Sequence, residues 1–141
     1  MKSDVLELIH DITHQYRSQQ FRALRDGDIT HMDGKVLGYF YRHPGATQRD
    51  LVVYSGRDKA QLARLIKSLR QRDLLSAEVD SGDRRNMKLT LTPAGQEVYA
   101  HLQQAAQRVT RSALTGFTPA EQQQLHDLLA RLQVNLVATE A

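Results

Sequence analysis

The chain has 141 residues, a formal net charge of +3 and 40% hydrophobic residues, which suits one domain over residues 1–141. It contains no cysteine, which excludes disulfides, thiolate metal ligands and cysteine-based redox sensing. No apolar run approaches a membrane span and the acidic N-terminal residues do not resemble a signal peptide, so we expect a soluble, cytoplasmic protein.

The N-terminal third predicts two amphipathic helices. In residues 5–16 the apolar residues recur at the spacing of one helix face, and Asp26-Gly27-Asp28 is expected to end this helix. Thr30-His-Met-Asp33 resembles a capping box that opens a second helix, which His43-Pro44-Gly45 ends. The buried stripe predicted for the second helix consists of Val36, Leu37, Phe40 and Tyr41.

The middle of the chain predicts a short helix followed by a basic one. Thr47-Gln-Arg-Asp50 is a cap signal for a helix to about Tyr54, and Ser55-Gly56 is the turn. Asp58 is the expected N-cap of the next helix, which ends near Arg72. The side chains expected to face inward from this helix are Leu62, Leu65, Ile66 and Leu69.

The C-terminal half predicts a hairpin and two long helices. Residues 75–79 and 87–91 read as strands, with the charged residues Asp83, Arg84 and Arg85 at the hairpin tip. Thr92-Pro93 opens one long helix, and Thr118-Pro-Ala-Glu121 is a strong capping box for the last helix. The last helix carries a leucine stripe at Leu125, Leu128, Leu129, Leu132 and Leu136.

These elements predict a mainly α fold with a small β-hairpin. Residues 30–92 form a winged helix-turn-helix, and residues 1–25 and 93–138 form long flanking helices suited to dimerisation. A monomer would not easily cover the apolar faces of three flanking helices, although packing within one subunit stays open for the last helix.

The basic helix and the hairpin indicate DNA binding. Between Arg49 and Lys88 ten Lys and Arg residues stand against six Asp and Glu, so the positive charge is concentrated there. If the leucines face inward, Arg64 and Lys67 face outward for the major groove, with Lys59, Arg70 and Arg72 on the flanks. The hairpin arginines suit the adjacent minor groove. The predicted DNA-binding residues are Arg57, Lys59, Ala60, Gln61, Arg64, Lys67, Asp83, Arg84 and Arg85.

The sequence supports functions other than specific DNA binding less strongly. A basic face on a helix is often only solvated, and it also suits non-specific DNA binding or a protein partner. The sequence has no Gly-rich phosphate loop, nucleophile elbow or cysteine nucleophile, so we expect no catalytic residues, no enzyme activity and no cofactor. His10 and His14 have the i, i+4 spacing of metal ligands, but without an obvious third ligand we assign no metal.

The chain resembles the multiple-antibiotic-resistance regulator (MarR) family of bacterial transcription factors. The resemblance rests on the basic helix from Asp58 to Leu69, on Asp83-Arg84-Arg85, and on Leu89-Thr-Leu-Thr-Pro-Ala-Gly95. It implies a homodimer whose first and last two helices interlock, and a repressor of a pseudo-palindromic operator. It also implies release by a small aromatic or anionic ligand bound between the dimer helices and the winged helix-turn-helix.

Two features limit what the resemblance implies. Many relatives carry Ser or Thr where this chain has Ala60 and Gln61, so their operator preferences do not transfer. The ligand region would include aromatic residues of the first two helices, with His14, Arg17 or Lys35 available for an anion. These aromatic residues are Tyr16, Phe21, Tyr39, Phe40 and Tyr41, and core packing is the simpler role for Phe40 and Tyr41.

Overall fold

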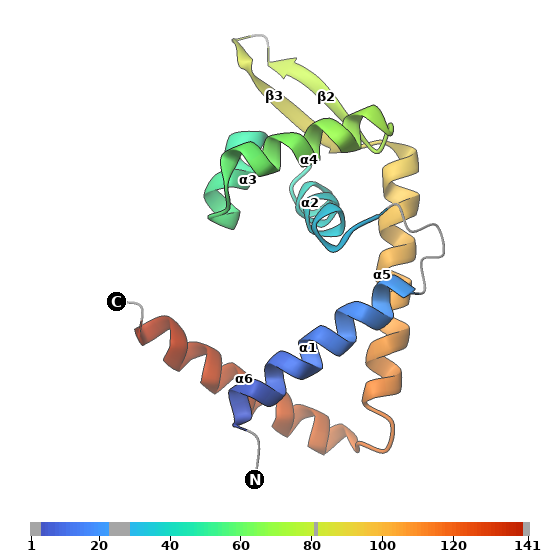
Figure 1. The fold of residues 1–141 in the computed structure, drawn as a ribbon, viewed down its shortest axis with the longest axis vertical. Coiled ribbons are helices and arrows are strands. Elements are labelled where there is room, and N and C mark those ends of the chain that lie inside the picture. Colours follow the sequence, from blue (N-terminus) through green and yellow to red (C-terminus); the bar gives the residue numbers. More distant parts are fainter. Residues whose placement is uncertain (1–3, 23–28, 81, 140–141) are drawn as a thin grey trace. The chain divides into compact units, whose positions relative to one another are not determined.

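A computed structural model describes residues 4–22, 29–80 and 82–139, so the predicted break at Asp26-Gly27-Asp28 lies outside the described residues. The chain divides into two compact units, Met1–Gln107 and Arg108–Ala141. The helices are α1 (Val5–Arg22), α2 (His31–Arg42), α3 (Gln48–Ser55), α4 (Lys59–Gln71), α5 (Pro93–Ala113) and α6 (Pro119–Thr139); the strands are β1 (Ala46–Thr47), β2 (Leu75–Asp80) and β3 (Asp83–Leu91) (Figure 1). The predicted mainly α fold with a hairpin is confirmed.

Local capping starts the helices where the sequence predicts. At α2 the Asp33 amide donates to the Thr30 hydroxyl and the Thr30 amide donates to the Asp33 carboxylate, both at 3.1 Å. The same reciprocal pair occurs at Thr47–Asp50 for α3 and at Thr118–Glu121 for α6. Each cap satisfies backbone donors that a helix N-terminus leaves open.

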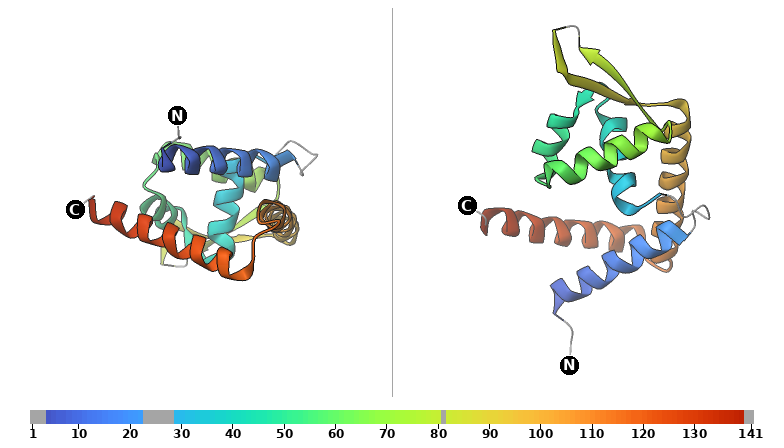
Figure 2. Two further views of the ribbon diagram at one scale, coloured as in Figure 1. Left: turned by 90° about the horizontal axis from the view of Figure 1, so that it is seen from below. Right: turned by 45° about the horizontal axis from the view of Figure 1, so that its top comes forward.

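The sheet has three antiparallel strands in the order β1-β3-β2. Strand β1, which the sequence did not predict, pairs Ala46 with Leu89 and Thr47 with Lys88. The β2–β3 hairpin is longer than predicted and extends past helices α3 and α4 (Figures 1 and 2). Asp83, Arg84 and Arg85 are therefore the first residues of β3, whereas the sequence prediction placed them in the tip.

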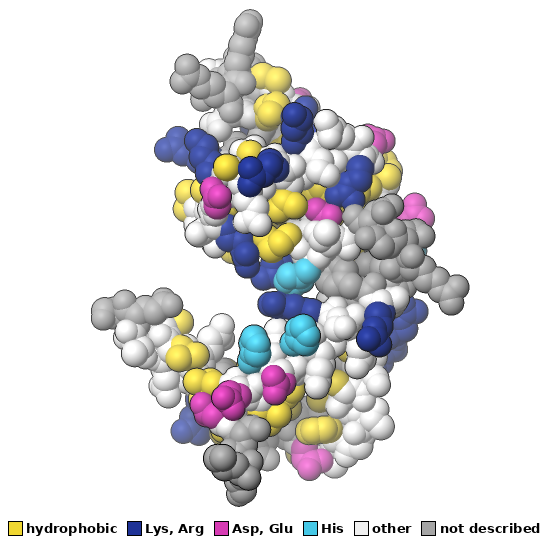
Figure 3. Space-filling model, viewed as in Figure 1, with side chains coloured by type: hydrophobic (Ala, Val, Ile, Leu, Met, Phe, Trp, Pro, Cys, Tyr) yellow, Lys and Arg dark blue, Asp and Glu magenta, His cyan; other side chains and the backbone are white. Residues whose placement is uncertain are grey.

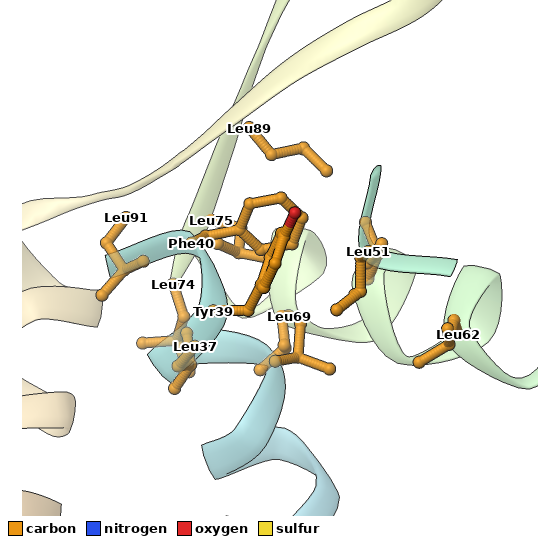
Figure 4. Packing of buried hydrophobic residues seen from close by; sticks show 12 residues of the cluster. Leu37, Tyr39, Phe40, Leu51, Leu62, Leu69, Leu74, Leu75, Leu89 and Leu91 are labelled. Atoms are coloured by element: carbon orange, nitrogen blue, oxygen red, sulfur yellow. The ribbon is translucent and has the colours of Figure 1, made fainter. Parts of the chain in front are cut away.

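The core lies where α2 meets α4 and the sheet. Figure 4 shows Phe40 among leucines from α3, α4 and both long strands, and Phe40 is fully buried. The prediction of Tyr41 as a core residue is wrong: Tyr41 is 50% exposed and its ring lies tilted against that of Tyr99, whereas Tyr39 is only 7% exposed. Residues 36–40 of α2 are all buried, so the buried part of the helix is not a single stripe, and it ends before Tyr41.

An ion pair with a buried carboxylate joins the end of α4 to the start of α2. Asp33 is only 3% exposed, and its Oδ2 accepts from Arg72 Nη2 at 3.0 Å as well as from the Thr30 amide. One carboxylate therefore caps α2 and holds the C-terminal end of α4. Removing Arg72 should be strongly destabilising, because the buried Asp33 carboxylate would keep its desolvated charge.

The same end of α4 also abuts the start of α5. The Thr92 hydroxyl donates to the Asp73 carbonyl at 2.6 Å and accepts from the Gly95 amide at 3.0 Å. A Cβ at Gly95 would overlap the carbonyl oxygen of Leu74, so this approach requires glycine. The beginning of α5 is thus fixed directly to the residues that follow α4.

The two terminal helices differ from this core. The apolar residues of α1, including Val5, Leu8 and Ile12, are about half exposed, and no residue of α6 is buried in the described part of the chain. Leu128, at the centre of the predicted leucine stripe, is 47% exposed. Among the described helices, none is long and apolar enough to cross a lipid bilayer.

Candidate nucleic-acid interface

Helix α4 has the two faces that its sequence predicts. The Asp58 carboxylate caps it by accepting from the Ala60 amide at 3.0 Å. Leu62, Ile66 and Leu69 are buried and Leu65 is half-buried, which fixes the rotation of the helix. The opposite face carries the exposed side chains of Ala60, Gln61, Arg64 and Lys67. Lys and Arg side chains are spread over the surface formed by α3 and α4 (Figure 3).

The cations flanking α4 are placed in different ways. Arg57, in the turn before α4, and Lys59, in its first turn, are exposed. Arg70 donates from Nη1 to the Met87 sulfur at 3.8 Å and so reaches the hairpin. Arg72 is directed to Asp33, a structural role that the spacing of charges along the sequence does not reveal.

The hairpin arginines occupy the far end of the sheet. The register pairs Asp80 with Asp83 beside the turn, so Asp83, Arg84 and Arg85 begin β3 at the end farthest from the core. The side chains of these three residues lie outside the described part of the chain. Their predicted roles therefore remain predictions that rest on backbone position.

A cleft lies at the corner between α3, α4 and β3, and we call it the wing cleft. It has a volume of about 630 Å³. Its lining residues are Gln48, Arg49, Val52, Val53, Lys59, Asn86, Met87 and Leu89. Of these, only Lys59 was predicted to contact DNA, because the other residues come together only when β3 folds against α3.

A second hollow, the α2 cavity, lies within the first unit and has a volume of about 410 Å³. It is lined by Gln20, His31, Gly34, Lys35, Gly38, Arg42, Tyr54, Tyr99, Leu102, Gln103 and Ala106. No acidic residue is among these described lining residues. A Cβ at Gly38 would lie 3.2 Å from the Tyr99 ring, so glycine allows α5 this close to α2.

Positive charge converges on the α2 cavity. Burial, followed by repulsion from Arg17 and Arg57, lowers the pKa of Lys35 below its ordinary value. Burial lowers the pKa of His31 as well, with smaller contributions from Arg17, Lys35 and Arg57. Cations from α1, α2 and the turn before α4 therefore lie close enough to repel one another.

The ligand-binding residues predicted from the sequence agree only in part with the residues that line the α2 cavity. Lys35 lines the α2 cavity, but Tyr16, Tyr39, Phe40 and Tyr41 do not, and the side chain of Phe21 lies outside the described residues. Tyr54 and Tyr99 are the aromatic lining residues instead. In the part of the chain that the structure describes, no three potential metal-binding side chains group together, so nothing adds a third ligand to His10 and His14.

Known proteins are similar to this chain in sequence. A model of the MarR family matches residues 28–86. The HTH-type transcriptional regulator YybA of Bacillus subtilis (strain 168) is 29% identical over 134 residues, which cover 95% of this chain and 89% of YybA.

Solved structures agree at the level of the fold. The crystal structure of MarR superposes with a TM-score of 0.82 at 23% identity, covering 99% of this chain and 95% of that one. A MarR-family regulator from Listeria monocytogenes, solved with a 26mer DNA, gives a TM-score of 0.79 at 24% identity and covers 98% and 92% of the two chains.

Proposed function

Because the chain belongs to the MarR family of transcriptional regulators, we propose that it is a ligand-responsive repressor that binds a pseudo-palindromic operator as a homodimer. The relatives named above are regulators, and this chain too is a regulator and not an enzyme. We place its action in the cytoplasm.

The observation that carries this proposal is the exposed face of α4. With 13 residues α4 is about 20 Å long, which suits the major groove. Arg64 is suited to bond both acceptors on a guanine edge, a contact worth roughly 1–3 kcal/mol of discrimination. Ala60, Gln61 and Lys67 share its face, Arg57 and Lys59 suit phosphates, and Asp83, Arg84 and Arg85 suit the minor groove.

The uncovered terminal helices support the homodimer. Apolar side chains at helical spacing remain exposed on both α1 and α6, and a second copy of the chain offers the same faces in return. We assign residues 1–25 and 93–138 to this dimer and residues 30–92 to DNA. Two-fold symmetry then sets two half-sites about one helical turn apart.

The α2 cavity supports the response to a small ligand. Its lining includes the cations Lys35 and Arg42 and, among the described residues, no carboxylate, so it favours an anion. The first turn of α2 contributes His31, Gly34 and Lys35 to the cavity and also carries Asp33, which holds Arg72. A ligand that displaces this turn would therefore shift α4.

Fluorescence anisotropy tests the proposal. The full chain is titrated against duplexes tiled across the region upstream of its own gene, with a random duplex as control, from low to physiological salt. We expect one duplex to bind far more tightly than random and to keep this advantage at physiological salt. Equal weak binding of all duplexes, lost as salt rises, would identify non-specific binding, and no binding would favour a protein partner.

A further inference from the structure

We propose that Lys35 in the α2 cavity is a site of reversible carbamate formation, at which the Nζ nitrogen takes up carbon dioxide. The inference goes beyond the proposed DNA binding, because it assigns a covalent modification to one side chain of the cavity. The product carries a negative charge where the lysine ammonium carries a positive one. Carbon dioxide would thus reverse the charge at this position.

The reaction requires the neutral amine of Lys35. The lone pair on Nζ forms a bond to the carbon of carbon dioxide, the electron pair of one C=O bond moves to oxygen, and one N–H proton leaves to solvent. Nothing is oxidised or reduced. Burial, followed by repulsion from Arg17 and Arg57, lowers the pKa of Lys35 below the ordinary value of 10.5. A lower pKa increases the neutral, reactive fraction near pH 7.

The amine of Lys35 is accessible and has no acidic partner. Lys35 is an exposed residue and lines a cavity of about 410 Å³, so dissolved carbon dioxide can reach it. Within the described residues, Lys35 forms no ion pair, and no carboxylate lines the cavity. A carboxylate beside the amine would favour the protonated form, which does not react.

The cations around Lys35 would stabilise the product as well. Arg42 lines the same cavity, while Arg17 on α1 and Arg57 in the turn before α4 lie close enough to repel the ammonium. None of these three arginines forms an ion pair in the described part of the chain, so their charges are not already compensated there. Neighbours that repel a lysine ammonium attract its carbamate. The modification would therefore change a cavity that favours anions into one that repels them.

The test is chemical trapping of the carbamate in the full-length protein. The chain is equilibrated with isotopically labelled carbon dioxide and hydrogencarbonate near neutral pH, and triethyloxonium then converts each carbamate to a stable ester. Digestion and mass spectrometry report the label at each lysine. Lys67 and Lys88 are the internal controls, because both are exposed lysines that do not line the α2 cavity. We expect the label at Lys35 to exceed that at either control severalfold.

Substitution of the arginines separates the effect of charge from that of access. Arg17→Gln and Arg42→Gln each keep Lys35 but remove one positive charge, so labelling of Lys35 should fall severalfold. Arg49→Gln, which removes an exposed arginine that does not line the cavity, should leave labelling at the wild-type level.

Labelling of Lys35 no greater than that of Lys67 and Lys88 would overturn the proposal. An undiminished label in both Arg17→Gln and Arg42→Gln, or an equal fall in Arg49→Gln, would overturn it as well. The readout needs no DNA, so a chain that binds no duplex would contradict the proposed function and leave this inference standing.

Discussion

Helices α4 and α6 carry leucines at the same spacing but differ in what covers them. On α4, Leu62 and Leu69 are almost completely buried by α2, α3 and the sheet. On α6, Leu125 and Leu129 are about 40% exposed, and no residue of the helix is buried in the described chain. An identical sequence pattern thus belongs to a finished core in one region and to an open face in the other.

The difference separates two kinds of stability. The core around Phe40 is complete within one chain, so its contribution to the free energy of unfolding does not depend on protein concentration. The faces of α1 and α6 become buried only when a partner covers them, so their contribution should rise with concentration. The predictions below test this division, beginning with the largest expected effect.

Phe40→Ala should lower the free energy of unfolding by about 3–5 kcal/mol at any protein concentration, because it removes a fully buried ring. Urea denaturation measures this loss. Phe117→Ala is the matched control in the loop before α6, where the ring is 44% exposed, and it should lose less than about 1 kcal/mol. Equal losses of unfolding free energy at Phe40 and Phe117 would show that the core ring contributes no more to stability than the exposed one.

Leu125→Asp combined with Leu129→Asp should weaken the proposed dimer roughly a hundredfold, since two charges would be placed in an apolar interface. Sedimentation equilibrium measures the dissociation constant. Gln123→Asp, on the opposite face of α6, should leave it nearly unchanged. A dimer of undiminished affinity in the double variant would show that the leucine face is not the interface.

Arg64→Ala should reduce discrimination between target and random duplex by about 1–3 kcal/mol and leave folding and dimerisation intact. Anisotropy with both duplexes gives the ratio of affinities. Arg131→Ala, which removes an exposed arginine from α6, serves as control. If discrimination survives in the Arg64 variant, the exposed face of α4 does not read bases at that position.

The smallest expected effect is on the pH dependence of the free energy of unfolding. Because the pKa of His31 is lowered in the fold, the unfolded chain binds its proton more readily. Stability should therefore fall as pH drops below the ordinary value of 6.5 toward the folded value, and His31→Gln should reduce this dependence. Parallel pH curves for wild type and variant, measured by urea denaturation, would contradict it.

Features that depend on neighbouring residues were predictable from the sequence. The capping boxes at Thr30, Thr47 and Thr118 form within four residues, and each is present in the structure. The inward and outward faces of α4 also follow from helical periodicity alone.

Features that depend on residues far apart in the chain were not predictable from the sequence. Strand β1 exists only because Ala46 and Thr47 meet β3, and two residues carry no periodic signal. The ion pair between Asp33 and Arg72 spans 39 positions, and Asp33 already had a local role as a cap. The wing cleft and the α2 cavity combine residues from separate elements, so their cations appeared in the sequence only as scattered charges.

The close contact at Gly95 fixes the start of α5 to the residues that follow α4, so a rotation about this point moves the other end of the helix the most. With 21 residues this helix is about 30 Å long, and its first turn is fixed to Leu74 and Asp73. Turning it by about 5° carries one end roughly 3 Å relative to the other, close to the rise of one base pair of about 3.4 Å. In the proposed dimer, a small rotation of α5 would therefore change the spacing of the two copies of α4 by a distance comparable to one base-pair step.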